Sequence, residues 1–184
     1  MTPKTQASVD FREAVFELSK TMPFARDFIN SGRLSRPYQY IGSSLISEDD
    51  NSFCSYGILP GQSILDAPIF IGRKQTWLMD QIAIGFSLVA FVDEEKTAIS
   101  ITKYLDEVCR QLDLVEQFLV VTSKRLNGRS KKFLCDTSGL AFERWAACDG
   151  TIYLVRPDHH IAARWKATPT ISELKKAYRK SISL

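Results

Sequence analysis

Two short apolar runs, separated by an amphipathic segment, constrain this sequence more than any other feature. The runs "FSLVAFV" (residues 86–92) and "EQFLVVTS" (residues 116–123) are rich in β-branched and aromatic residues, which is typical of strands buried on both faces. Between them, apolar side chains recur at helical spacing, at Ala98, Ile101, Leu105, Val108, Cys109 and Leu112. Because neighbouring parallel strands need such a crossover, residues 86–123 predict a βαβ unit.

The stretch "DGTIYLVRPDHHIAARW" (residues 149–165) predicts an antiparallel hairpin of two further strands, 151–156 and 160–165. Arg156, Pro157, Asp158 and His159 fit a β-turn between them, since proline fixes φ at the second position and aspartate is tolerated at the third.

A helix is predicted after the hairpin, in "TPTISELKKAYRKSI", where Thr170 and Glu173 stand at capping-box spacing. A shorter helical element is expected in "DTSGLAFERWAA", before the hairpin. The resulting order is β-α-β, a short helix, then β-β-α. This order predicts an α/β fold, a thioredoxin-like three-layer domain with a mixed sheet.

The N-terminal part differs in character from the rest. Apolar residues between positions 9 and 30 follow helical spacing, which Pro23 should interrupt. A connector rich in serine, glycine, proline and aspartate follows. We therefore expect a helical extension and connector over residues 1–56 and a thioredoxin-like domain over residues 57–184.

Composition indicates one domain with an appendage, because 184 residues with 45% hydrophobic content suffice for one full core. The net charge of +3 is small. Two stretches are basic. Residues 123–132 carry no aromatic residues for base stacking, and the set Lys175, Lys176, Arg179 and Lys180 is expected to be a solvated helix face whose cations complement the helix C-terminus. We therefore expect no nucleic-acid partner.

No membrane segment is expected either, since the longest apolar run (residues 82–92) is far shorter than the roughly 20 residues that span a bilayer. The first residues also lack the apolar segment of a signal peptide, which predicts a cytoplasmic protein.

Cysteine chemistry is not predicted. Cys54, Cys109, Cys135 and Cys148 form no CxxC pair, and we expect them to be small buried side chains. A thioredoxin-type enzyme places its nucleophilic cysteine where the first strand meets the first helix, but here that junction holds Asp93, Glu94 and Glu95. The sequence thus predicts a redox-inactive domain.

Other catalytic and cofactor motifs are missing from the sequence. It contains no GxGxxG, no P-loop and no GxSxG, so we expect no cofactor bound by this chain. The only histidines, His159 and His160, are adjacent, and on a strand they would point to opposite faces rather than hold one metal ion. The alternative is a small-molecule or peptide groove beside the hairpin, with Arg156, His159, His160 and Arg164 as contacts.

Several motifs carry a family resemblance. "YLVRPDHHIAARW" (residues 153–165) is similar to a Leu-Val-Arg-Pro-Asp-Gly-His-Val-Ala-Trp-Arg signature, "YIGSSL" (40–45) to Tyr-x-Gly-Ser-Pro-Leu, and "PGQSILDAPI" (60–69) to Pro-Gly-x-Arg-x-Pro-Asp-Ala. "TWLMDQIAIGFSLVAF" (76–91) and "LCDTSGLAFERWAA" (134–147) follow in the same order. These motifs resemble the C-terminal domain of FAD-dependent aromatic-ring hydroxylases, the phenol hydroxylase and polyketide hydroxylase group.

The resemblance implies a thioredoxin-like fold without redox cysteines, and no matched segment supplies a catalytic residue. It predicts an accessory module that forms homo-oligomers or docks onto a separately encoded flavoprotein through its helical N-terminal segment. FAD and NAD(P)H would then be bound only by that partner. The alternative is a subunit that completes a split aromatic hydroxylase in trans.

Overall fold

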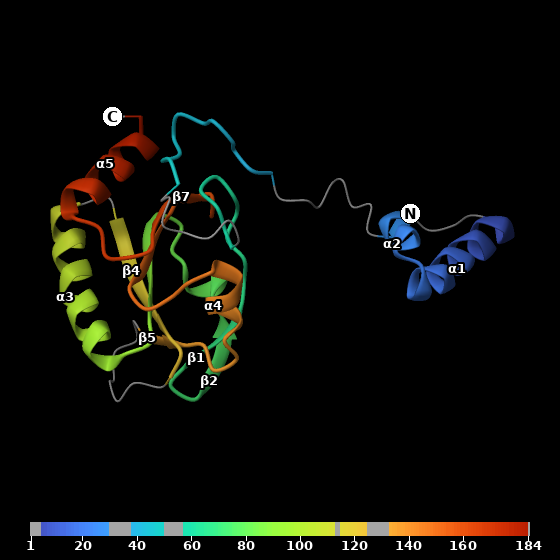
Figure 1. The fold of residues 1–184 in the computed structure, drawn as a ribbon, viewed down its shortest axis with the longest axis horizontal. Helices are drawn as coiled ribbons and strands as arrows, with labels where there is room; N and C mark the ends of the chain where they lie inside the picture. Colours follow the sequence, from blue (N-terminus) through green and yellow to red (C-terminus); the bar gives the residue numbers. More distant parts are fainter. Residues whose placement is uncertain (1–4, 30–37, 50–56, 113–114, 125–132, 184) are drawn as a thin grey trace. The chain divides into compact units, whose positions relative to one another are not determined.

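The computed structural model describes residues 5–29, 38–49, 57–112, 115–124 and 133–183. The chain divides into two compact units, Met1–Pro37 and Tyr38–Leu184 (Figure 1). The first unit holds two helices, and the second holds a sheet with its covering helices.

The helical unit contains α1 (Gln6–Thr21) and α2 (Pro23–Ile29). The α1 helix begins after Thr5, whose side chain accepts a hydrogen bond from the backbone N–H of Ser8. It ends at Met22, immediately before Pro23, and proline is well suited to the first position of the next helix. The predicted interruption at Pro23 is confirmed.

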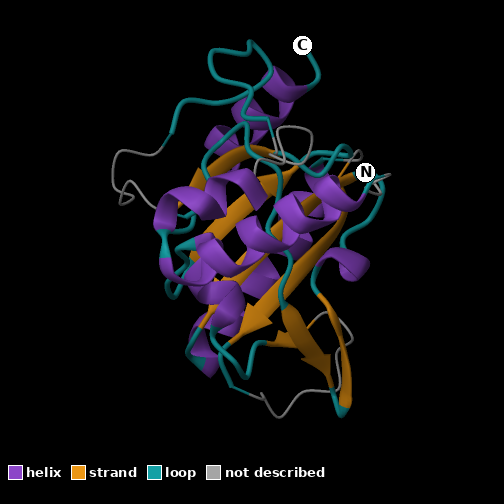
Figure 2. Cartoon of the chain, turned by 90° about the vertical axis from the view of Figure 1, so that its right-hand side faces the viewer, coloured by secondary structure: helices purple, strands orange, loops and turns teal. Residues whose placement is uncertain are grey.

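The second unit is built on a mixed seven-stranded sheet in the order β2-β1-β5-β4-β3-β6-β7. Figure 2 shows strands in orange and helices in purple. The pairs β3–β4 and β4–β5 are parallel, and the others are antiparallel. The predicted parallel pair and the predicted hairpin are therefore confirmed. The strands are β1 (Pro68–Ile71), β2 (Lys74–Trp77), β3 (Phe86–Val92), β4 (Val115–Thr122), β5 (Phe133–Cys135), β6 (Thr151–Val155) and β7 (Ile161–Trp165).

Helices complete the three layers. α3 (Glu95–Gln111) and α5 (Ile171–Ser181) lie on one side of the sheet, and α4 (Leu140–Trp145) lies on the other, while the short 3-10 helix η1 (Met79–Gln81) precedes β3 (Figure 1). The central strand β3 is buried throughout: Leu88 and Ala90 pack in the core cluster with α3 and α5, while Val89 and Phe91 pack in the cluster with α4. Alternation along one strand thus builds both cores.

The connector joins the sheet unit earlier than expected. The backbone N–H of Tyr40 donates to Gly61 O (3.0 Å), and that of Ser47 donates to Ala162 O (2.9 Å). Ile161 N donates to Gln62 O (2.9 Å) on the same outer edge of β7. These bonds place residues 38–49 with the second unit, so the division follows Pro37 rather than residue 56. The two ends of the connector, residues 30–37 and 50–56, lie outside the described residues.

Three cysteines in the described residues are free. Cys135 is buried as expected, Cys109 is partly buried, and Cys148 is exposed, which corrects the expectation for that residue because it lies in the loop before β6. Cys54 and most of the basic stretch 123–132 lie outside the described residues. No described helix is long and apolar enough to cross a bilayer.

The α3–α5 layer makes stability sensitive to alkaline pH. Tyr104 Oη is buried without a hydrogen-bond partner among the described residues, and burial, together with the charge of Glu173, raises the Tyr104 pKa to about 12. As the pH rises, Tyr104 therefore ionises in the unfolded chain before it ionises in the folded one. Its titration leaves the free energy of unfolding unchanged below about pH 10 and lowers it as the pH rises toward 12.

We expect Tyr104→Phe to leave stability at neutral pH unchanged or slightly higher, because no hydrogen bond is lost. Above pH 10 the variant should lose less stability than the wild type. Urea unfolding at a series of pH values checks this. An alkaline loss of the same size in both proteins would contradict the expectation.

Candidate functional site

The turn that carries both histidines is a tight hairpin connection. His159 N donates to Arg156 O (2.9 Å), and Arg156 N donates to His160 O (2.9 Å). His159 adopts a left-handed conformation (φ 59°) that moves it out of the strand pattern. The predicted turn is confirmed, and its geometry is set by the backbone of this segment.

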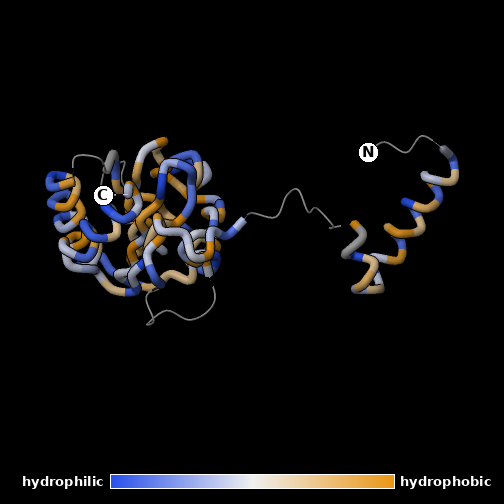
Figure 3. The backbone as a smooth tube through the Cα atoms, turned by 90° about the horizontal axis from the view of Figure 1, so that it is seen from above, coloured by the Kyte–Doolittle hydropathy of each residue, from blue (hydrophilic) through white to orange (hydrophobic). Residues whose placement is uncertain are grey.

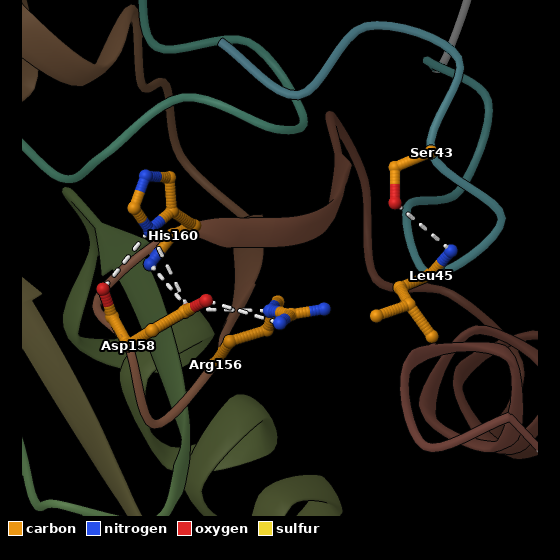
Figure 4. Close-up of polar contacts among 5 residues, drawn as sticks. All are labelled: Ser43, Leu45, Arg156, Asp158 and His160. Carbon is orange, nitrogen blue, oxygen red and sulfur yellow. Dashed lines mark hydrogen bonds and ion pairs between the residues drawn. The ribbon is translucent and has the colours of Figure 1, made fainter. Parts of the chain in front are cut away.

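Asp158 organises the polar side chains of this turn (Figure 4). Its carboxylate accepts from Arg156 Nε (3.2 Å) and Nη2 (3.0 Å), and also from the backbone N–H of His160 (3.2 Å). Burial acts to raise the pKa of Asp158, but these hydrogen bonds and charges outweigh it and hold the pKa below its usual value.

The His160 ring is fixed from two sides. Its Nδ1 lies 2.9 Å from the carbonyl oxygen of Asp158, so Nδ1 must carry the proton, because a carbonyl can only accept. Tyr40 packs edge-on against the ring, with centroids 4.9 Å apart. Within the described residues, no group of three or more histidine, cysteine, aspartate or glutamate side chains is placed to hold a metal ion.

Arg164 lies in a different environment from Arg156. Arg164 pairs with Tyr153 in the β6–β7 register, and Tyr153 precedes Arg156 by three positions in the sequence. The Arg164 side chain is fully buried. Nε and Nη2 bind Asp49 at 2.6 and 2.7 Å, and Nη1 binds Ile58 O at 3.1 Å. The structure therefore brings Arg156 and His160 together around Asp158, leaves His159 at the turn, and puts Arg164 in a separate buried network.

The Arg164 network holds the connector against the sheet. Desolvation opposes the charge on Arg164, but the hydrogen bonds and charge of Asp49 outweigh it and raise the pKa above its usual value. Burial also raises the pKa of Tyr153, whose hydroxyl donates to Trp145 O. Sequence reasoning missed Asp49, because its partner lies 115 residues away and no local pattern links them.

The junction of β3 and α3 holds a second residue that the sequence did not reveal. Asp149, from the loop before β6, accepts from Asp93 N (2.7 Å) and Glu94 N (3.4 Å) through Oδ1. Its Oδ2 accepts from the Thr97 hydroxyl (2.9 Å). A carboxylate from elsewhere in the chain therefore binds the two residues that precede α3 and a hydroxyl of its first turn, where a redox enzyme of this fold would hold its thiolate.

We expect Asp149→Ala to lower the free energy of unfolding by about 1 to 2 kcal/mol, because it removes the acceptor of three hydrogen bonds at the start of α3. Asp149→Asn keeps an acceptor oxygen and should cost less than the alanine variant. Urea unfolding followed by tryptophan fluorescence measures both variants. Equal stability of Asp149→Ala and the wild type would show that the contacts contribute nothing.

Two surface cavities of about 440 and 420 Å³ lie beside α5 rather than at the histidine turn. They share Ser47, Glu48 and Lys180. The first is lined by residues of β7 and α5, among them Trp165, Glu173 and Lys176. Acidic and basic side chains are mixed in this cavity, so it shows no preference for one sign of charge.

The fold defines the class, a thioredoxin-like domain, and its β3–α3 junction holds the carboxylate of Asp149. Thiol peroxidase from Chromobacterium violaceum shares the fold at a TM-score of 0.56 and 10% identity, with 70% of this chain and 91% of that chain covered. The sequence itself matches no protein-family model and no curated protein.

Two solved flavin enzymes contain the same fold as part of a longer chain. The flavin-dependent monooxygenase PieE, in complex with FAD and substrate, matches at a TM-score of 0.62 and 17% identity over 98% of this chain and 30% of its own. Aklavinone-11 hydroxylase, with FAD and aklavinone, matches at 0.55 and 18% identity over 77% of this chain and 26% of its own. The predicted likeness to FAD-dependent hydroxylases is confirmed at the level of the fold, and this chain spans less than a third of either enzyme.

Proposed function

We propose that this chain is an accessory module of a flavin-dependent aromatic hydroxylase, and that it contributes by association without redox chemistry of its own. Support comes from the fold shared with parts of PieE and aklavinone-11 hydroxylase and from the hydroxylase-like motifs of the sequence. FAD and NAD(P)H would bind to a flavoprotein portion outside residues 1–184. That portion would also bind the aromatic substrate.

The observation that carries the proposal is the acidic β3–α3 junction. Asp149 accepts from the backbone N–H groups of Asp93 and Glu94, which precede the helix, and Glu95 begins the helix. A thiolate is activated by nearby cations and by helix N–H groups, whereas this junction gathers carboxylates that would oppose a second negative charge. The arrangement favours a structural junction over a peroxidase centre.

The starts of α3 and α5 support the expectation that this chain binds no dinucleotide cofactor. A pyrophosphate is usually bound by free N–H groups at a helix N-terminus. In the sheet unit, α3 begins against the carboxylate of Asp149, and α5 begins against that of Glu173, which accepts from Thr170 N (2.7 Å). Both helix starts would repel a second anion, so we derive no flavin step from this chain's residues.

The test uses the purified chain. We expect no stoichiometric FAD in its visible absorbance spectrum, no NAD(P)H oxidation with phenolic substrates, and no peroxide reduction with dithiothreitol. Bound FAD with turnover by this chain alone would overturn the proposal. Peroxide reduction that disappears in Cys148→Ser would overturn the redox-inactive part, because Cys148 is the exposed cysteine among the described residues.

A second candidate, a subunit that completes a split hydroxylase in trans, is favoured by the match of 98% of this chain to 30% of PieE. Co-expression with a flavoprotein from a neighbouring gene, one that lacks a counterpart of this chain, is the appropriate test. We expect a stable complex and faster substrate-dependent NAD(P)H oxidation. Absence of both would eliminate this candidate.

A further inference from the structure

The α5 helix carries a strongly basic strip on its outer side. We define the α5 basic face as Ser172, Lys175, Lys176, Arg179 and Lys180, the described residues that together line one surface cavity of about 570 Å³. Their spacing keeps them within about two fifths of the helix circumference. The buried residues of α5 lie on its other side, in the core cluster with β3 and α3. Figure 3 shows hydrophilic and hydrophobic residues alternating on the left of the sheet unit, where α3 and α5 lie.

The described part of the chain does not neutralise the four cations of the α5 basic face. Lys175 Nζ donates to Gln111 Oε1 (2.8 Å), a neutral amide, and none of the four forms an ion pair with a described residue. Lys175 and Arg179, like Lys176 and Lys180, are like-charged neighbours four positions apart, which destabilises a helix. The helix C-terminus favours cations only in the last turn, which holds Arg179 and Lys180 but neither Lys175 nor Lys176. An anionic partner would relieve this repulsion.

Charge argues against two occupants that this chain itself could supply. A two-fold interface brings the same surface of both copies together, so two α5 basic faces would repel each other. In the helical unit, two of the three acidic side chains of α1 already have cationic neighbours: Glu17 binds Lys20 (2.6 Å), and Glu13 lies 4.0 Å from Arg12. The anion that suits the α5 basic face therefore belongs to another molecule.

The charges around the α5 basic face favour a protein over a nucleic acid or a membrane. Glu48 and Glu173 line the adjoining cavity, which shares Lys176 and Lys180 with the face. These carboxylates would repel a uniformly anionic surface, such as a phosphate backbone or an anionic bilayer, whereas a folded protein can place a cation opposite them. The face also has no aromatic residue on which bases could stack and no apolar residue that could enter a bilayer.

We propose that the α5 basic face docks onto an acidic surface of the flavoprotein portion that carries FAD. This docking rests on the proposed accessory role, and it puts the contact on α5 rather than on the helical N-terminal segment. From Ser172 to Lys180 the face spans about 12 Å along the helix, so the partner would present its carboxylates within that length. Exposed charges of this kind act mainly on the rate of association and on its dependence on salt.

The test uses a fluorescein-labelled oligoglutamate peptide as the acidic probe, titrated with the full chain at low salt and followed by fluorescence anisotropy. We expect binding that is lost by about 0.5 M salt, because the exposed charges are then screened. Lys176→Gln combined with Arg179→Gln should weaken binding by about 10-fold, since it removes two of the four cations.

Arg73→Gln combined with Lys74→Gln is the matched control. It also removes one arginine and one lysine, both exposed, and so changes the net charge by the same amount. These residues lie at the β1–β2 hairpin, and β2 is at the opposite edge of the sheet from β7, the strand that α5 contacts. We expect the control to bind the peptide within about two-fold of the wild type. Circular dichroism and tryptophan fluorescence check that both double variants keep the fold.

Several results would overturn the docking assignment. These are no binding of the peptide at low salt, undiminished binding by the α5 double variant, or equal weakening in the control. Tighter binding of a single-stranded oligonucleotide of the same charge, or of vesicles that contain phosphatidylserine, would overturn the choice of a protein partner. None of these results bears on the proposed accessory role, which fails instead if the purified chain carries FAD with turnover or reduces peroxide. The two failures are therefore distinguishable.

Discussion

Asp49→Ala is expected to lower the free energy of unfolding of the sheet unit by about 3 kcal/mol, the lower end of the cost of breaking a buried ion pair. The Arg164 side chain is fully buried, and Asp49 supplies two of its hydrogen bonds at 2.6 and 2.7 Å. Without Asp49, the desolvated guanidinium would lose two charge-assisted hydrogen bonds. Urea unfolding followed by fluorescence measures the effect, since Trp77, Trp145 and Trp165 all lie in this unit.

The reverse substitution, Arg164→Met, should cost less. It leaves Asp49 without its partner, but the Asp49 side chain is 39% exposed and water can solvate it. Methionine also fills much of the volume that the arginine stem leaves. In the Arg164→Met background, Asp49→Ala should then have little effect. Additive losses in the double variant would mean that the two residues stabilise the fold independently.

The elements that the sequence predicted are those whose signals are local. The strand at residues 86–92 is a continuous apolar run, and all seven residues of β3 are buried. The capping box of α5 needs only Thr170 and Glu173, three residues apart, and both of its hydrogen bonds are present. The turn at Pro157 and Asp158 is likewise determined within five residues.

Three strands were not specified by the sequence, because their signals are short. β5 has three residues and pairs through Phe133, Leu134 and Cys135 with the end of β4. β1 and β2 have four residues each, and most of β2 is exposed, so neither shows a clear alternation. Strands of this length form because an existing sheet edge is available for pairing. The position of that edge depends on the tertiary structure and cannot be read from a local sequence pattern.

The site contacts escaped prediction for a related reason. Asp149 binds the residues that precede a helix more than 50 residues earlier in the chain, and Asp49 binds Arg164 across 115 residues. Sequence patterns identify residue types that favour helix caps and ion pairs, but they do not identify the distant residue with which such a side chain interacts. The four residues predicted as contacts share one hairpin in sequence, yet the structure divides them between a partly buried turn and the fully buried Arg164 network.

Gly57→Ala is expected to destabilise the sheet unit by about 3 kcal/mol or more, through steric overlap and backbone strain. Gly57 has φ +84°, a conformation that L residues rarely adopt, and a Cβ there would lie 2.3 Å from Ala146 Cβ. Backbone atoms of Ala146 and Trp145 would stand 3.0 Å away, so little can move aside. The connector would have to separate from the end of α4, and the loss should appear in urea unfolding at an unchanged slope.

Ala146→Gly provides the control, because it removes the Cβ that the new methyl group would strike. Ala146 itself has φ 49°, so glycine at this position should be neutral or stabilising by a few tenths of a kcal/mol in the wild-type background. In the Gly57→Ala background it should recover part of the loss, and the remainder would reflect the positive φ at residue 57 and the close backbone atoms. If Ala146→Gly recovered nothing, the side-chain overlap would not be the cause. If Gly57→Ala itself were as stable as the wild type, the close packing of the connector on α4 would be wrong.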